Sequence, residues 1–391
     1  MSDKYFEFYN GVKILNGEYS IENIAYELNY HNVTKPLLLS GKKLEDIGLV
    51  SSLRQMIAGV NIEAIFTNIP NDSSTETIDF IIDYYEDNGC DCIIALGGGS
   101  VIDTAKCVKM AISQNAHSIL ELMGNENLVA GKHIPLFIVP TTLGTGAECT
   151  TVAVIKNAKT NTKMEFISAE LLPDAIFLDA RMTATLPPPM IGATAMDALC
   201  HAIEAYSCIQ KNPISDIYAT ASIKIISENI IKAVKTQSAE CRQQLALGAS
   251  LAGVAFSNSM VGVVHAIAHA IGGVCGVPHA NAIAILLPAC MEYYSAVYAK
   301  EYSNLLLYLT DEETYATTPA ELRSRMSAEI VKKIKKTLGY VAKMPTDFSA
   351  YGVTERDFAE IIAKAKSDGA ILMSPRLVTK SDIYNILQMC M

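Results

Sequence analysis

Three consecutive prolines, Pro187 to Pro189, separate two parts of the chain that have different apolar patterns. Between Pro36 and Asp179, short apolar runs alternate with longer amphipathic stretches, which is typical of β/α units around a parallel sheet. After Gly192 the apolar runs are rich in Ala, Ile and Leu and are long enough for helices. The pattern therefore predicts an α/β part followed by an all-α part. The expected strands are PLLLS (36–40), CIIAL (92–96), PLFIV (135–139) and AIFLD (175–179).

The proline run also suits a domain boundary, because it cannot continue a helix and is stiff. We expect one domain over residues 1–185 and a second over 186–391, with the hinge between about 180 and 190.

Charge and cysteine content exclude several classes of protein. The chain has 31 Lys and Arg against 41 Asp and Glu, a net charge of −10, which argues against a nucleic-acid partner. No apolar run approaches the roughly 20 residues that a bilayer span needs, and the N-terminus lacks the pattern of a signal peptide. The ten cysteines are scattered without a C-x-x-C pair, as expected for reduced thiols. We expect a cytoplasmic protein without membrane partners that forms a homodimer or larger homo-oligomer.

A glycine-rich loop follows the second expected strand. Gly97, Gly98, Gly99 and Ser100 stand between the run 92–96 and the helix-like VIDTAKCVKMAI. Glycines let the backbone approach a ligand closely, and a helix N-terminus offers N–H groups to a pyrophosphate. Ser100 and Asp103 also match a capping box, an interpretation that needs no ligand. The spacing differs from G-x-G-x-x-G, so the ordinary dinucleotide fingerprint is absent.

A second loop, PTTLGTGAE (140–148), follows the run 135–139 and again combines hydroxyls with glycines. Two such loops at one edge of a parallel sheet would form a dinucleotide site. The fold prediction is thus an α/β domain with a parallel dinucleotide-binding sheet, followed by an all-α domain.

Four of the seven histidines lie between residues 201 and 279. Asp197 and His201 are four residues apart in an Ala-rich helical stretch, so both leave the same face, which is expected to be buried. His265 and His269 repeat this spacing, and a Gly/Pro loop precedes His279. A buried carboxylate is costly unless it is paired or bound to a metal, and one carboxylate with three imidazoles suits a first-row divalent ion. The alternative for each histidine is a core imidazole bonded to a carbonyl.

These motifs resemble those of the iron-containing, or group III, alcohol dehydrogenases over nearly the whole chain. The motifs that carry the resemblance are GGGSVIDTAK (97–106), PTTLGTGAE (140–148), DALCHAIEAY (197–206) and HAIAHAIGGVCGVPHANAIAILLP (265–288). The family resemblance implies a dehydroquinate-synthase-like architecture with an N-terminal dinucleotide domain, a helical metal domain and an active site between them.

The resemblance also implies roles for individual residues. Asp197, His201, His265 and His279 would bind Fe(II), with Zn as a substitute. His269 would lie near the nicotinamide. Because an imidazole titrates near neutral pH, it is the candidate to carry the released proton, and the alternatives are a ligand role or a packing role. Phe256 would line the substrate channel. The implied cofactor contacts are Asn71, Gly98, Gly99, Ser100, Thr141, Thr142, Thr145 and Lys163.

One departure from the family concerns the coenzyme. Many relatives carry Asp after the first strand, where this chain has Gly41 followed by Lys42 and Lys43. A carboxylate there would repel a 2′-phosphate, whereas glycine leaves room and the lysines supply positive charge. We therefore expect either NAD or NADP as cofactor, with NADPH accepted. The alternative is that Gly41 is a turn residue and the lysines are a solvated pair.

The predicted function is a metal-dependent, NAD(P)-linked alcohol dehydrogenase or aldehyde reductase that acts on a small alcohol or aldehyde. Three rival functions stay open. They are a hydroxyacid-oxoacid transhydrogenase, a dehydroquinate-synthase-like NAD and metal enzyme, and a non-catalytic nucleotide or metal sensor. Turnover of free NAD(P)H by a simple aldehyde would distinguish the predicted function from all three.

Overall fold

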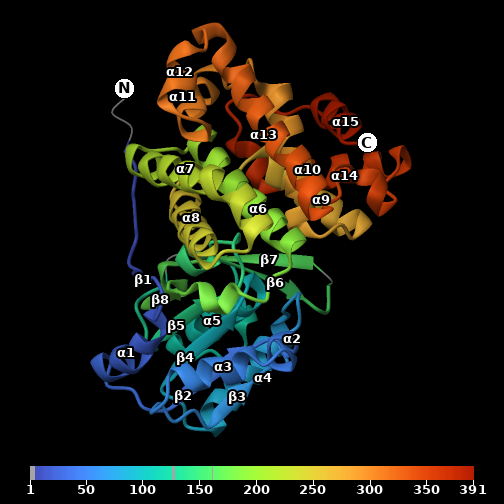
Figure 1. Cartoon of the computed structure of the whole chain (residues 1–391). Helices are drawn as coiled ribbons and strands as arrows, with labels where there is room; N and C mark the ends of the chain where they lie inside the picture. The colour runs from blue at the N-terminus through green and yellow to red at the C-terminus, as the bar shows by residue number, and fades with distance from the viewer. Residues whose placement is uncertain (1–4, 126–127, 161) are drawn as a thin grey trace. The chain divides into compact units, whose positions relative to one another are not determined.

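The computed structural model describes residues 5–125, 128–160 and 162–391. It separates into two compact units, one from Asn10 to Thr185 and one from Leu186 to Met391, and residues 5–9 group with the second unit. The first unit contains all the described strands, and the second is built from helices (Figure 1). The predicted succession of an α/β part and a helical part is confirmed. No helix among the described residues is long and apolar enough to cross a membrane.

A six-stranded parallel sheet forms the centre of the first unit, in the order β1-β8-β5-β4-β2-β3. Its strands are β1 (Lys13–Asn16), β2 (Pro36–Ser40), β3 (Ala64–Phe66), β4 (Cys92–Gly97), β5 (Leu136–Pro140) and β8 (Ala175–Leu178). The four predicted strands are β2, β4, β5 and β8, each within a residue of its expected ends. A separate antiparallel hairpin, β6 (Val152–Asn157) and β7 (Thr162–Ile167), was not predicted.

Helices cover both faces of the sheet, which is why its central strands are apolar throughout. The helices of this unit are α1 (Ile24–Tyr30), α2 (Lys42–Asp46), α3 (Leu49–Met56), α4 (Thr75–Asp87) and α5 (Gly99–Ser113). Helices α1 and α3 pack with one set of alternating strand residues, including Leu38, Ile94 and Phe137. Helix α5 contacts strands β4 and β5 and also packs against α4 (Figure 1).

The second unit is a set of helices packed around one buried central helix, α6. Its helices are α6 (Pro188–Ser207), α7 (Pro213–Thr236), α8 (Ala239–Ser257), α9 (Val263–Cys275), α10 (His279–Tyr294), α11 (Ala299–Leu309), α12 (Glu312–Thr317), α13 (Ala320–Ala342), α14 (Phe358–Ser367) and α15 (Lys380–Met389). Helix α6 packs against α7, α8 and α10, and α9 packs against α10 and α14.

The proline run directly follows the division between the two units and also begins a helix. Pro188 and Pro189 form the first turn of α6. Proline is favourable there because the first N–H groups of a helix have no partner within the helix and the fixed φ is already helical. Two of the three prolines therefore also start the central helix, directly after the division between the two units at Leu186.

Candidate metal centre and dinucleotide loops

The four predicted metal ligands lie close together on three helices of the second unit. Asp197 and His201 are one turn apart on α6, His265 lies on α9, and His279 is the first residue of α10. The Nε2 atoms of His279, His265 and His201 lie 3.6, 3.8 and 4.0 Å from the same Asp197 Oδ1 atom. Asp197, His201 and His265 are buried, whereas the His279 side chain is 41% exposed. The Gly/Pro loop does bring His279 to the cluster.

The electrostatics of this cluster favour a bound cation. Burial raises the pKa of Asp197 to about 7, with the His265 charge opposing and Glu204 reinforcing the shift. Within the part of the chain that the structure describes, neither Asp197 Oδ1 nor His265 Nε2 has a hydrogen-bond partner. Buried polar atoms are normally satisfied, and a divalent ion between these two atoms would satisfy both. Three imidazoles and one carboxylate fit a first-row divalent metal.

The sequence analysis missed a supporting carboxylate, Glu204, on α6. Its Oε2 atom lies 2.5 Å from His265 Nδ1 and accepts a 2.9 Å hydrogen bond from the Gly262 N–H. Its Oε1 atom accepts a 2.7 Å hydrogen bond from the Val264 N–H. Glu204 therefore caps the N-terminus of α9 and holds the His265 ring with Nε2 toward Asp197. Burial opposes protonation of His265, but the bond and charge of Glu204 outweigh it and raise the His265 pKa.

His269 lies beside the cluster and has a separate partner. Its Nδ1 atom is 2.8 Å from Asp368 Oδ2, and its ring stacks on His279 with centroids 5.2 Å apart. Burial alone would raise the pKa of Asp368. The hydrogen bond and charge of His269 outweigh burial, so the pKa of Asp368 is lowered. Asp368 Oδ1 also accepts the Ala370 N–H at 2.9 Å, so this carboxylate is fixed from two sides. The His269 side chain is 41% exposed, which suits exchange of a proton with solvent.

Phe256, expected to line a substrate channel, lies against the cluster. Its ring stacks on His201 with centroids 4.4 Å apart, and His201 in turn stacks on His265 at 4.5 Å. Phe256 therefore forms an apolar wall beside the cluster at Asp197.

In the first unit, the predicted cofactor loops gather at the carboxyl edge of the sheet. Strand β2 lies between β3 and β4 in the sheet. The chain runs from β2 to β3 on one side and then continues with β4 and β5 on the other side, so the strand order reverses at β2. Ligands of open α/β sheets bind at the carboxyl ends of strands at such a reversal. Gly41 follows β2, Gly98 follows β4, and Thr141 follows β5.

The two glycine-containing loops touch each other. A Cβ atom on Gly98 would lie 2.7 Å from Thr142 Cγ2, and one on Gly99 would lie 3.2 Å from Thr145 Cγ2. The Thr141 N–H donates to the Gly97 carbonyl at 3.0 Å. Glycine is thus required at position 98 by the close approach of the second loop, and the N-terminus of α5 stays open to an anion.

The polar residues around α5 correct one interpretation. Helix α5 begins at Gly99, and its N-cap Gly98 makes no side-chain cap. The Ser100 hydroxyl instead donates to the Asn71 carbonyl, and Asp103 accepts the Val154 N–H at 3.1 Å. The Ser100 and Asp103 capping box is therefore wrong. The structure places Asn71 and Ser100 in contact.

Lys163 lies on strand β7, and its ammonium is 3.3 Å from a carboxylate oxygen of Asp72. Both side chains are 65% exposed, so this ion pair contributes little to stability. Asp72 directly follows Asn71, so the structure puts Lys163 near that part of the predicted cofactor set.

A buried lysine, Lys106, shapes the second loop and was not assigned from the sequence. Its ammonium donates to the carbonyls of Ala147 and Val152 and to the Thr150 hydroxyl at 2.6 to 2.9 Å. Burial lowers the pKa of Lys106. The only signal in the sequence was its place at the end of the GGGSVIDTAK motif, which does not say what a lysine there contacts.

Gly41 is the N-cap of α2 with an extended backbone. A Cβ atom there would meet only ordinary contacts, 3.5 Å from the Ile69 carbonyl and 3.9 Å from Val101. A larger residue would therefore fit at position 41 without strain. The effect of glycine here is to leave the space beside the end of β2 open. Lys42 pairs with Glu45 at 2.6 Å and with Asp46 at 3.2 Å, so part of its expected charge is already offset.

Comparison with known proteins identifies the class. Residues 11–180 match the model of the iron-containing alcohol dehydrogenases, and residues 191–391 match that of the Fe-containing alcohol dehydrogenase family, C-terminal. The chain is 28% identical to an NAD-dependent methanol dehydrogenase of Bacillus methanolicus, covering 95% of this chain and 96% of that one. It is also 28% identical to an NADPH-dependent butanol dehydrogenase of Clostridium saccharobutylicum, covering 96% and 95%.

A solved structure of 1,3-propanediol oxidoreductase superposes with a TM-score of 0.92 at 27% identity, covering 99% of this chain and all of that one. The chain belongs to the iron-containing alcohol dehydrogenase family. It is an oxidoreductase that acts on alcohols.

Proposed function

We propose that this protein uses Fe(II), held by Asp197, His201, His265 and His279, to interconvert a small alcohol and its aldehyde with NAD or NADP. The observation that carries the proposal is the approach of three imidazole Nε2 atoms to one buried carboxylate oxygen at 3.6 to 4.0 Å. The family match supports the same reaction class.

The donor set supports iron, with zinc as a substitute. Three imidazoles and one carboxylate contain no thiolate, so they do not select zinc by softness. Structural zinc sites are usually closed at four ligands, whereas alcohol chemistry needs room for the substrate oxygen. We therefore expect purification in air to lower activity, because Fe(II) is oxidised.

A divalent ion in this site would act as a Lewis acid toward the substrate oxygen, and the nicotinamide would exchange the hydride. The chain supplies the rest of the chemistry. Glu204 holds His265 in orientation, and Phe256 shields one side of His201. His269, backed by Asp368, is the candidate group that passes the alcohol proton to solvent.

The dinucleotide would bind at the carboxyl edge of the sheet. Gly98, Gly99 and Ser100 would approach the pyrophosphate, and the hydroxyls of Thr141, Thr142 and Thr145 and the residues Asn71 and Lys163 would contribute polar contacts. The contact of Gly98 with Thr142 supports this assignment, because it brings both loops to one place. The space beside Gly41 supports acceptance of NADPH.

A panel of simple aldehydes, assayed with NADH and NADPH on anaerobically iron-reconstituted protein, tests the proposal. We expect oxidation of the free coenzyme by at least one short aldehyde, dependent on iron. A chain that turns over no aldehyde with either free coenzyme, yet exchanges hydride between a hydroxyacid and an oxoacid, would instead be a transhydrogenase. Binding of coenzyme without any turnover would favour a sensor.

A further inference from the structure

A second group of metal-binding side chains lies in the first unit. His31 follows helix α1 and precedes β2, His133 precedes β5, and Asp174 immediately precedes β8. These strands are parallel members of one sheet, so all three residues lie at its amino edge. The predicted dinucleotide loops lie at the carboxyl edge, and strand β5 separates the two edges by about 15 Å. The cluster is therefore distinct from the cofactor loops.

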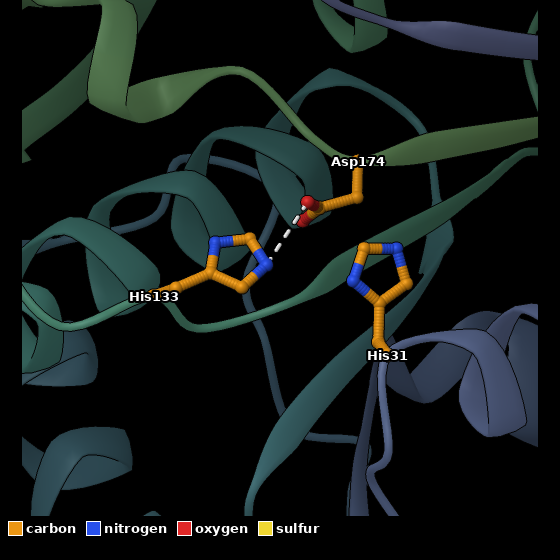
Figure 2. Close-up of side chains that lie close together, drawn as sticks. All are labelled: His31, His133 and Asp174. Atoms are coloured by element: carbon orange, nitrogen blue, oxygen red, sulfur yellow. Dashed lines mark ion pairs between the residues drawn. The ribbon is translucent and has the colours of Figure 1, made fainter.

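The three side chains converge, as Figure 2 shows. His133 Nε2 lies 3.3 Å from Asp174 Oδ1, and one potential ligand atom from each residue lies within 4.8 Å of the other two. The His31 and His133 rings are 5.6 Å apart with an angle of 32° between their planes. Ligand atoms of a tetrahedral zinc ion with bonds of 2.0–2.1 Å are about 3.3 Å apart, so small rotations of the rings would complete a site.

The scaffold holds two of these side chains in place. Asp174 Oδ2 accepts the Leu136 N–H at 2.8 Å, which leaves Oδ1 directed to His133, and the Asp174 N–H donates to the Leu136 carbonyl at 2.9 Å. The His31 ring packs edge-on against Phe137 at 5.6 Å and against Tyr30 at 5.2 Å. Such hydrogen bonds and packing contacts around the ligands are typical of metal sites.

Exposure and charge are also compatible with an ion. The His133 side chain is 60% exposed and that of Asp174 is 15% exposed, so an ion can enter from solvent and keep water ligands. The nearby Lys109 ammonium donates to the Leu172 carbonyl and contributes a positive charge that competes modestly for Asp174. Two imidazoles and one carboxylate suit zinc, nickel or copper rather than magnesium or calcium.

We propose that His31, His133 and Asp174 bind one borderline divalent cation, represented by zinc, with water completing its coordination. The ion would join the end of α1 to the amino ends of β5 and β8. Because it would bind only the folded unit, it would stabilise that unit without entering the alcohol reaction. This inference is independent of the identity of the metal at Asp197.

The test measures zinc binding by the full chain in equilibrium dialysis at buffered free zinc. A His265→Ala background weakens the other metal centre, so that the remaining high-affinity zinc can be attributed to the new site. We expect one bound zinc in this background. The added substitution His133→Ala should remove it, whereas His117→Ala, at an exposed histidine outside the cluster, should not.

Asp174→Asn provides a second variant that keeps an acceptor for the Leu136 N–H. It should also lose the zinc while its melting temperature without zinc stays near that of the parent. Zinc should raise the melting temperature of the parent and leave that of both cluster variants unchanged. Equal zinc binding by the His133→Ala and His117→Ala chains, or a zinc-dependent melting shift that survives both cluster substitutions, would overturn the proposal.

Discussion

Glu204 shows how a residue that is not itself a candidate metal ligand can fix the orientation of one, His265. It lies seven residues after Asp197 on the buried face of α6, so helical spacing in HAIEAY placed it on the same face as the ligands. Its three partners on α9, however, come from a segment about 60 residues away and could not be deduced from spacing. The candidate ligands could be proposed from the sequence because Asp and His commonly bind metals, whereas the role of Glu204 depends on its contacts with Gly262, Val264 and His265.

Glu204→Gln should therefore weaken metal binding. A glutamine side chain has one acceptor oxygen, so it cannot accept from the Gly262 N–H, the Val264 N–H and His265 together. Loss of a hydrogen bond that orients a ligand typically costs about 10-fold to 100-fold in metal affinity. Iron affinity measured by competition with a chelator checks this, with the exposed Glu228→Gln on α7 as the matched control. Unchanged affinity in a folded Glu204→Gln chain would remove this role from Glu204.

His269→Ala should separate proton transfer from metal binding. The His269 Nδ1 atom is engaged by Asp368, whereas the imidazoles found within 4.0 Å of Asp197 Oδ1 are those of His201, His265 and His279. We expect near-normal iron content together with lower turnover and a changed pH profile of kcat. The measurements are iron per chain and kcat against pH. If iron falls as far as it does in His265→Ala, His269 is a ligand and the assignment fails.

At the scale of elements, helix α5 links both halves of the candidate cofactor site. Gly98 is its N-cap and Gly99 its first residue, and Lys106 and Asp103 bind the segment from Ala147 to Val154. The sequence predicted this helix and its glycine loop from periodicity. It could not predict the hairpin β6–β7. Nor could it predict that Asp103 accepts the Val154 N–H instead of capping the helix, because both features depend on contacts between distant segments.

Asp103 should make stability depend on pH. Burial raises its pKa to about 6, while Lys106 and the Val154 N–H oppose the shift. An acid whose pKa is raised on folding stabilises the folded state below its unfolded value near 4, and this stability is lost as the pH rises through about 6. A shift of about two units corresponds to about 3 kcal/mol. Asp103→Asn should therefore lose less stability between pH 4 and 7 than the wild type.

Urea denaturation at several pH values measures this difference. Asp83→Asn, at an exposed aspartate on α4, is the control and should follow the wild type. Parallel pH dependences of the wild type and Asp103→Asn would contradict the account.

The turn between β2 and α2 should influence the choice of coenzyme. Gly41→Asp would place a carboxylate where a Cβ atom fits without strain, and it would repel a 2′-phosphate. We expect NADPH use to fall far more than NADH use, by about 1 to 3 kcal/mol in kcat/KM if charge-assisted hydrogen bonds are lost. The kcat/KM values for both coenzymes in wild type and variant are decisive. A wild type that strongly prefers NADH, with an unmoved ratio, would exclude this role.

At the scale of the whole molecule, features set by local sequence patterns could be predicted better than features set by contacts between distant segments. The central strands are buried on both faces of the sheet, which makes their apolar runs visible in the sequence. The position of β1 beside β8, and the meeting of His31, His133 and Asp174, depend on pairing between residues far apart in the chain. Assembly into a homodimer or larger homo-oligomer stays a prediction.

The most direct test of the central claim is the iron content of the anaerobically reconstituted wild type and of His265→Ala, measured together with alcohol oxidation. His117→Ala, which removes an exposed histidine outside both metal-binding clusters, is the matched control. We predict that His265→Ala loses about one iron per chain and its iron-dependent activity, whereas His117→Ala keeps both. Equal iron content and activity in the wild type and His265→Ala would show that the buried cluster at Asp197 is not the metal centre.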